Sequence, residues 1–194
     1  MAGWIVVGLG NPGPTYAATR HNIGYLVADE LAGRMAGTWR RHRSGRADVA
    51  QGRIGPPGSE DAPAVTLVRS RSHMNESGGA VQAVASYLSV PHDHLVVVHD
   101  ELDLEFGSLR VKYGGGDNGH NGLRSVRRSL GSGDWYRVRL GLGRPPGRQD
   151  PADYVLSVFS AAQRRELAEV VARGADAAES LVLRGLEATQ NTFH

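Results

Sequence analysis

Glycine-flanked polar clusters recur at four places in this 194-residue chain, and they contain the side chains best suited to chemistry. Glycine lets a backbone approach a ligand, and asparagine offers both a hydrogen-bond donor and an acceptor. A single cluster is more typical of a turn, but four exceed what turns alone require. They are Gly10-Asn11-Pro12-Gly13, Ser72-His73-Met74-Asn75, His99-Asp100-Glu101-Leu102-Asp103 and the glycine-rich residues 114–122.

The types and spacing of these residues disfavour three other kinds of site. Asp100, Asp103 and Glu105 are potential cation ligands, but no histidine pair has metal-ligand spacing, so we expect no metal. The pattern Gly-x-Gly-x-x-Gly at 8–13 matches a dinucleotide fingerprint, yet prolines interrupt it and the next predicted helix begins about ten residues later, which disfavours a nucleotide cofactor. No Gly-x-Ser-x-Gly elbow is present. Capping roles stay open for His21 and Asp100.

The elements that must position these clusters alternate between strands and helices. This order is typical of an α/β sheet flanked by helices. Apolar runs predict strands at 4–9, 46–54, 64–68, 95–98, 109–112 and 135–142, and helical spacing predicts helices at 23–35, 77–88, 121–130 and 161–186. The polar loop 55–63 predicts a hairpin, so we expect a mixed sheet. Three clusters directly follow strands, where α/β sheets bind ligands, so they could share one crevice.

Composition limits the class of protein. The length suits one domain, which we expect to span residues 1–194. The absence of cysteine excludes disulfides and a thiol nucleophile. The N-terminal apolar run breaks at glycine after a few residues, and no stretch approaches the roughly 18 apolar residues of a membrane span. We therefore expect a cytoplasmic protein without membrane contact.

The net charge of +2 conceals an uneven distribution. Residues 110–148 carry nine arginines and lysines against two aspartates, a local charge of +7, and the rest of the chain carries −5. A whole-chain sum hides such local fields. This segment could bind a polyanion, or its arginines could simply be solvated.

Together the clusters resemble bacterial-type peptidyl-tRNA hydrolase. The matching segments recur in order over nearly the whole chain. They are GLGNPGPTYAATRHNIG (8–24), SHMNESG (72–78), VVHDELDLEFGSLRVKYGGGDNGHNGLRS (97–125) and YRVRLGLGRP (136–145). Two departures are His73, where an aromatic residue is usual, and Asp117-Asn118 in the glycine-rich loop. The first would change one wall of the peptide groove, and the second would change the mobility of the loop.

The resemblance implies a single domain with a twisted mixed β-sheet flanked by helices, acting without a cofactor on the ester between peptide and tRNA. His21 would be the general base, because a neutral imidazole can activate water at physiological pH. Asp100 would orient it and stabilise the imidazolium. Asn11 would lie closest to the ester and stabilise the oxyanion. Peptide-binding positions would be Tyr16, Met74, Asn75, His120 and Asn121.

The resemblance also accounts for the basic segment. Lys112 and Arg139 match the family's positions for tRNA phosphates. Arg124, Arg127 and Arg128 share one face of the helix predicted at 121–130, which could follow the acceptor stem through phosphate contacts. We expect a monomer whose partner is the acceptor stem and 3′ end of peptidyl-tRNA. A catalytically inactive RNA-binding protein and a nucleotide-dependent oxidoreductase are the alternatives.

Overall fold

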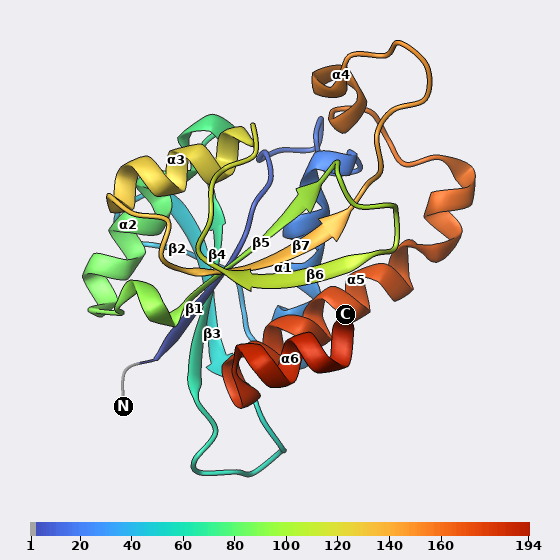
Figure 1. Cartoon of the computed structure of the whole chain (residues 1–194). Coiled ribbons are helices and arrows are strands. Elements are labelled where there is room, and N and C mark those ends of the chain that lie inside the picture. Colours follow the sequence, from blue (N-terminus) through green and yellow to red (C-terminus); the bar gives the residue numbers. More distant parts are fainter. Residues whose placement is uncertain (1–2) are drawn as a thin grey trace.

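A seven-stranded sheet with helices on both faces forms the centre of the computed structural model, which describes residues 3–194 (Figure 1). The strand order across the sheet is β2-β3-β4-β1-β5-β7-β6. The bounds are β1 Trp4–Gly8, β2 Arg40–Arg41, β3 Ala47–Arg53, β4 Ala64–Ser70, β5 Leu95–Glu101, β6 Leu109–Tyr113 and β7 Tyr136–Gly141.

The expected mixed sheet is confirmed. The four central strands β4, β1, β5 and β7 run parallel, so their carboxyl ends share one edge of the sheet. Antiparallel pairs flank them on both sides: β3 pairs with β4 through the predicted hairpin and with β2, and β6 pairs with β7.

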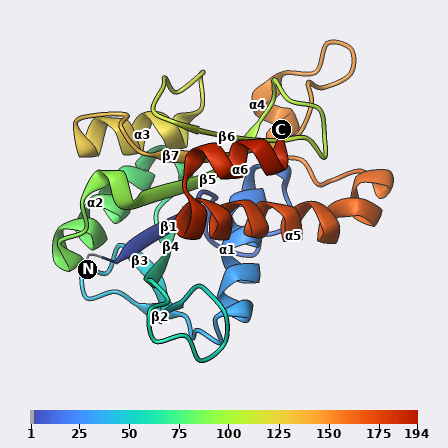
Figure 2. The same cartoon turned by 60° about the horizontal axis from the view of Figure 1, so that its bottom comes forward.

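Helices cover both faces. The α-helices are α1 Ile23–Arg34, α2 Ser77–Leu88, α3 Asn121–Leu130, α4 Pro151–Val155, α5 Ala161–Arg184 and α6 Leu186–Phe193, and the 3-10 turns are η1 Arg20–Asn22, η2 Met74–Glu76 and η3 His92–His94. One core packs α1 and α5 against the sheet, and the other packs α2 and α3 against the opposite face. Figure 2 shows α5 and α6 lying together, away from α2 and α3.

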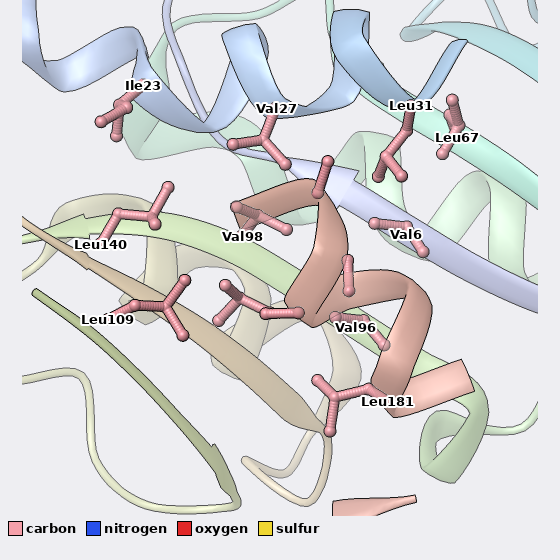
Figure 3. Close-up of a cluster of buried hydrophobic side chains, with 14 of the residues drawn as sticks. Val6, Ile23, Val27, Leu31, Leu67, Val96, Val98, Leu109, Leu140 and Leu181 are labelled. Carbon is pink, nitrogen blue, oxygen red and sulfur yellow. The ribbon is translucent and has the colours of Figure 1, made fainter. Parts of the chain in front are cut away.

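Alternation along the strands supplies both cores. In β1, Val6 faces the α1 side while Ile5 and Val7 face the α2 side, as the two-residue period of a strand requires. Figure 3 shows Val98 facing Val27 of α1 and Val6 facing Leu31 of the same helix. The parallel strands are apolar on both faces because helices cover both.

A close backbone contact fixes the start of α1 against the sheet. A Cβ on Gly24 would lie 2.5 Å from the carbonyl oxygen of Val98 and 2.6 Å from the amide nitrogen of Leu9. Only glycine allows this approach without a shift of the backbone. The contact places His21, just before α1, at the carboxyl ends of β1 and β5.

The predicted elements are all present, with three differences. The predicted C-terminal helix ends at Gly185, whose φ of +83° breaks it into α5 and α6. The strand predicted at 95–98 continues to Glu101, so His99 and Asp100 lie within it. The short α4, capped by the Asp150 side chain, and the two-residue β2 were not predicted. Within residues 3–194, no helix has both the length and the apolar character needed to cross a bilayer.

Candidate active site

A cavity of about 430 Å³ lies at the carboxyl ends of the parallel strands. The crevice expected after three strands is present, and the glycine-rich cluster forms part of it as well. The residues that these clusters contribute are Asn11, His73, Met74, Asn75, Asp100, Glu101, Leu102, Asn118, Gly119, His120 and Asn121; His21 also lines the cavity.

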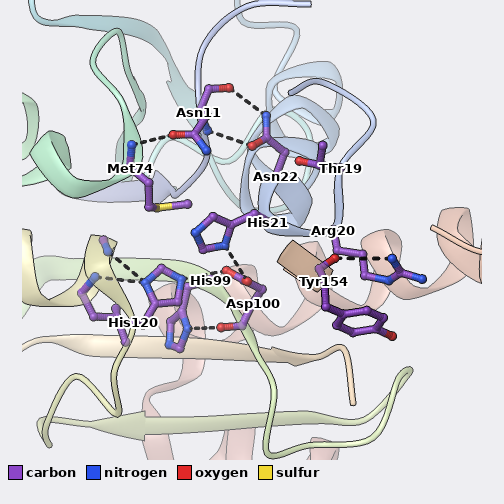
Figure 4. A network of polar contacts seen from close by, with 12 residues as sticks. Asn11, Thr19, Arg20, His21, Asn22, Met74, His99, Asp100, His120 and Tyr154 are labelled. Carbon is purple, nitrogen blue, oxygen red and sulfur yellow. Dashed lines mark hydrogen bonds and ion pairs between the residues drawn. The ribbon is translucent and has the colours of Figure 1, made fainter. Parts of the chain in front are cut away.

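The carboxylate of Asp100 lies between two histidines (Figure 4). Its Oδ2 is 2.7 Å from Nδ1 of His21, and its Oδ1 is 2.7 Å from Nε2 of His120. Asp100 is only 3% exposed. Burial opposes its ionisation, but the charges and hydrogen bonds of both histidines outweigh burial and hold its pKa well below the usual range. Asp100 is therefore a buried, ionised acceptor.

His21 is oriented so that one ring nitrogen remains available. Because Asp100 is ionised, Nδ1 of His21 carries the proton and donates a hydrogen bond to the carboxylate. Nε2 has no hydrogen-bond partner in the described part of the chain, and the side chain is 13% exposed to the cavity. Burial lowers the pKa of His21, but the charge and hydrogen bond of Asp100 outweigh it, so the net pKa is raised above 6.5.

The other histidine on Asp100 is fixed by the backbone. His120 precedes α3, and its Nδ1 accepts hydrogen bonds from the amides of Gly122, at 3.0 Å, and Leu123, at 3.2 Å. Since Nδ1 is an acceptor, Nε2 carries the proton and donates a hydrogen bond to Asp100. His99 packs edge-on against the His120 ring at 5.4 Å, and its Nδ1 bonds to the Asp100 carbonyl oxygen at 2.8 Å.

Asn11 presents a fixed amide to the cavity. The backbone amide of Met74 donates to its Oδ1 at 2.6 Å. The side chain of Asn22 bonds both backbone groups of Asn11, accepting from N–H at 2.8 Å and donating to the carbonyl at 2.9 Å. With Oδ1 identified as the acceptor, the Nδ2 group of Asn11 is the donor, and it has no partner among residues 3–194.

The rest of the cavity combines free amides with an apolar wall. Asn75 and Asn121 are exposed, and among residues 3–194 their side chains make no hydrogen bond. The wall contributed by α4 and the residue after it consists of Pro151, Ala152, Val155 and Leu156. Tyr16, predicted to frame the site, does not line the cavity; its ring packs edge-on against His73, which does, at 5.8 Å.

The Asp100 group offers the one set of three metal-ligand side chains within residues 3–194. The nitrogen and oxygen atoms of His21, Asp100 and His120 lie within 4.8 Å of one another. Both carboxylate oxygens already accept a ring N–H, so a metal ion would have to displace these two hydrogen bonds. The arrangement therefore fits an acid–base pair better than a metal centre.

A second cavity, of about 450 Å³, adjoins the first, and its lining includes three cations and the carboxylates of Glu101 and Asp103. Lys112 and Arg139 both line it, together with the buried Arg137. Arg139 forms an ion pair with Glu101 at 2.7 Å. Burial and the neighbouring Arg139 and Arg137 lower the pKa of Lys112. Glu101 and Asn118 line both cavities.

Proteins of similar sequence and fold identify the family of this chain. The family model described as peptidyl-tRNA hydrolase matches residues 5–194. The chain belongs to the peptidyl-tRNA hydrolase family. It is 55% identical to the peptidyl-tRNA hydrolase of Kineococcus radiotolerans, covering 98% of this chain and 96% of the relative. It is 53% identical to that of Streptomyces coelicolor, covering 100% and 96%. The crystal structure of peptidyl-tRNA hydrolase from Acinetobacter baumannii superposes with a TM-score of 0.87 at 27% identity, covering 99% of this chain and 94% of that one.

Several cations of the basic segment, residues 110–148, are buried or paired with carboxylates, which corrects the expected local charge. Of its nine cations, Arg137 is buried and donates to the carbonyls of Gly115, at 2.7 Å, and Gly116, so it holds the glycine-rich loop. Arg139 and Arg144 form ion pairs with Glu101 and Asp103, which lie outside the segment. The local charge of +7 thus overstates the free positive field, because a sum along the sequence ignores partners from elsewhere in the chain.

The α3 arginines keep their predicted face. Arg124, Arg127 and Arg128 are all exposed, and Arg124 lies 3.5 Å from Asp117. Neither Arg127 nor Arg128 has a carboxylate within 4.0 Å in the described chain. These two side chains are the most available cations of the helix.

Sequence reasoning missed residues that hold or line the site. Asn22 directly follows His21, and its proximity was a usable signal, but its contact with Asn11 depends on the tertiary fold. Asn118 was noted in the sequence as a departure in the glycine-rich loop, but its contacts were not predicted: it has a positive φ of 49° and donates to Glu101 and Asp103 at 3.2 and 2.6 Å. This departure from the family pattern therefore ties the glycine-rich loop to the end of β5.

Proposed function

We propose that this protein hydrolyses the ester bond between the peptide and the 3′-terminal ribose of peptidyl-tRNA, releasing tRNA and peptide for reuse in translation. The observation that supports this most directly is the His21–Asp100 pair facing the same cavity as the free amide of Asn11. Family membership supports the substrate. A protein that only bound RNA would need no such base and orienting carboxylate.

The chemistry proposed for His21 follows from its free Nε2. This atom takes a proton from a water molecule as the water oxygen attacks the ester carbonyl carbon. Asp100 keeps Nδ1 protonated and stabilises the imidazolium that forms. When the tetrahedral intermediate collapses, the imidazolium returns the proton to the departing ribose oxygen. No covalent enzyme intermediate is required, because activated water attacks the ester carbonyl directly and the ribose oxygen leaves as a hydroxyl once the imidazolium has protonated it.

Asn11 is the proposed oxyanion donor. Its Nδ2 group is free, and its orientation is fixed by Met74 and Asn22 before substrate arrives. A donor that needs no reorganisation is most effective, and removing one such donor typically costs about 2.7–4 kcal/mol of transition-state stabilisation.

We assign the recognition of the peptide backbone to the remaining amides. Asn75 and Asn121 line the cavity with side chains that have no hydrogen-bond partner among residues 3–194, and Met74 and His120 line it as well. Tyr16 packs against His73, which lines the same cavity. Amides that hydrogen-bond to the backbone of the substrate peptide do not distinguish one peptide side chain from another. The α-ammonium of a free aminoacyl-tRNA would be costly to bury against these donors without a carboxylate partner. This would spare the charged tRNA that translation needs.

We place tRNA phosphates at the second cavity and at α3. Lys112 and Arg139 would bind a phosphate near the acceptor end, and Arg124, Arg127 and Arg128 would follow the stem without reading sequence. We further propose that the protein acts in the cytoplasm, where its substrate forms, as a monomer with neither metal nor cofactor.

The decisive experiment compares N-acylated and free aminoacyl-tRNA as substrates of wild type and His21→Ala. Wild type should cleave only the N-acylated substrate, and His21→Ala should lose about 10²–10⁴-fold in kcat while still binding tRNA. His92→Ala, a histidine of η3 far from the cavity lining, is the matched control. Equal cleavage of both substrates would refute the selectivity, and full activity of His21→Ala would refute the general base.

A further inference from the structure

A second cluster of arginines lies on β2 and on the turn that joins β2 to β3. The segment 40–46, which we call the basic turn, has the sequence RRHRSGR. Its arginines, Arg40, Arg41, Arg43 and Arg46, are all exposed. Among residues 3–194 no carboxylate lies within 4.0 Å of any of them. In the described part of the chain the basic turn therefore carries a charge of +4 without an ion pair, because Asp48, opposite Arg41 across β2 and β3, pairs with Arg71 instead.

The basic turn lies at the same edge of the sheet as the candidate active site. Ala47 of β3 pairs with Ser70, the last residue of β4, whose carboxyl end faces that edge. The turn also reaches over α2. The guanidinium of Arg46 extends to within 2.9 Å of where a Cβ on Gly79 would lie. The guanidinium carbon of Arg43 is 5.2 Å from the centre of the Tyr87 ring.

Tyr87 adds an aromatic surface to the cluster. It is 56% exposed, the highest exposure among the large hydrophobic side chains of the described chain. His42 is buried beneath it and packs edge-on against its ring at 5.1 Å. An exposed ring beside unpaired guanidinium groups suits RNA, because arginine binds phosphates and aromatic rings stack on bases. An acidic protein partner would pair with the arginines but would have no base to stack on the exposed Tyr87 ring.

The helix between the basic turn and α3 is uncharged along its length, and the exposed Glu76 lies at its N-cap. Helix α2 packs beside α3 (Figure 1), and its sequence, SGGAVQAVASYL, contains no charged residue. The face thus runs from one set of arginines across a neutral helix to another. Four steps across the sheet separate β3 from β7, which carries Arg139, a distance of roughly 19 Å at about 4.8 Å per strand. A single phosphate cannot contact both sites.

We propose that the basic turn, together with Tyr87, is a second RNA-binding surface that contacts the backbone of peptidyl-tRNA beyond its acceptor end. This inference rests on the proposed function. The arginines bind phosphates of a part of the tRNA that a short substrate lacks, while the ester occupies the cavity of His21. The surface contributes to affinity for whole tRNA and takes no part in the chemistry.

The test uses Arg43→Gln/Arg46→Gln in the full-length protein, with two substrates: a full-length N-acylated tRNA and an N-acylated CCA trinucleotide. For the whole tRNA, KM should rise about tenfold, and the slope of log KM against log salt should become shallower by about 1 for each arginine–phosphate pair that the variant can no longer form. For the trinucleotide, kcat and KM should both stay unchanged. Arg43→Lys/Arg46→Lys should restore most of the affinity.

Arg165→Gln is the matched control. Arg165 is exposed on α5, on the other face of the sheet, and has no ion pair or side-chain hydrogen bond in the described chain. Its replacement removes the same kind of charge and should leave both substrates unaffected. An unchanged KM for whole tRNA in the Arg43→Gln/Arg46→Gln variant would overturn the proposal, and so would an equal rise for the trinucleotide. If wild type cleaves neither substrate, the proposed function itself fails.

Discussion

Asn22 bonds both backbone groups of Asn11, accepting from its N–H at 2.8 Å and donating to its carbonyl at 2.9 Å. The two residues come from separate parts of the same N-terminal segment, one just after β1 and the other at the end of η1. This pair ties the loop that holds the proposed oxyanion donor to the turn that holds His21.

Removing the side chain of Asn11 should slow the chemical step. We expect Asn11→Ala to lower kcat about 10²–10³-fold, because the oxyanion then has no amide donor at this position. Asn75→Ala should mainly raise KM, because that amide is assigned to peptide binding. Single-turnover cleavage of N-acylated tRNA separates the two effects. A pure KM change in Asn11→Ala would contradict the oxyanion assignment.

The activity should depend on the pKa of His21. Only the neutral imidazole can accept a proton, so kcat/KM should fall as pH falls through the raised pKa, with a midpoint above 6.5. In Asp100→Asn the carboxylate that raises this pKa is gone, while burial, which lowers it, remains. The acidic limb should therefore move to lower pH, together with a loss of activity of about 10²–10⁴-fold.

The control for this pH profile is Asp93→Asn, which removes the same charge from η3, outside both cavities. Its midpoint should match that of wild type. A midpoint that stays in place in Asp100→Asn would show that the limb belongs to another group.

Loss of either phosphate-binding cation should affect binding rather than catalysis. We expect Lys112→Ala and Arg139→Ala to raise KM for whole tRNA and to reduce its salt dependence by about 1 each, with turnover of a minimal ester unchanged. Arg139→Ala should have the larger effect, because it also leaves Glu101 without its ion-pair partner at the cavity wall. Equal effects on tRNA and on the minimal ester would contradict this assignment.

His99 should make the folded protein sensitive to acid. Burial, above all, and the adjacent His120 lower its pKa to about 3. Above pH 6.5 the imidazole is neutral in both the folded and the unfolded chain. As pH falls from 6.5 towards 3, only the unfolded chain binds the proton, so the free energy of unfolding should fall by up to about 1.4 kcal/mol per pH unit. Urea unfolding of His99→Asn at pH 7 and pH 5 should show a smaller loss than wild type, whereas His92→Asn should behave as wild type.

The contact at Gly24 should be intolerant of a methyl group. Gly24→Ala places Cβ 2.5 Å from a backbone oxygen, so we expect a loss of about 1–3 kcal/mol in the free energy of unfolding. Gly33→Ala, in the same helix with no atom within 4 Å of the added Cβ, should instead stabilise the protein by about 0.5–1 kcal/mol. Thermal unfolding of both variants measures the two changes in stability. If both substitutions shifted the melting temperature in the same direction and by a similar amount, helix propensity alone would account for them.

Much of the fold could be predicted because its signals are local. The apolar period of 77–88 and 121–130 defines two helices whose bounds agree with the structure. The common crevice followed from the positions of polar clusters after strands, since parallel strands end at one edge. The proximity of His21 and Asp100, 79 residues apart in sequence, came from family resemblance and not from any local pattern.

Other features depended on contacts that no local pattern encodes. The second histidine on Asp100 lies 20 residues away in sequence and Asn22 lies 11 residues from Asn11, and both contacts form only when the loops between them fold back. Arg137 counted as a free cation in the sequence but is buried under carbonyl groups. The basic turn was hidden in a remainder whose summed charge is negative, because its four arginines are outnumbered by acids elsewhere.

Glu101 and Asn118 form a common wall between the two cavities, and they bond to each other at 3.2 Å. The boundary between the cavities is therefore formed by one strand end and one loop. With an ester in the first and a phosphate in the second, as proposed, a substrate must present both groups at a fixed span. The enzyme would then select substrates by the distance between the ester and the phosphate, and would reject esters whose phosphate lies too near the ester or too far from it.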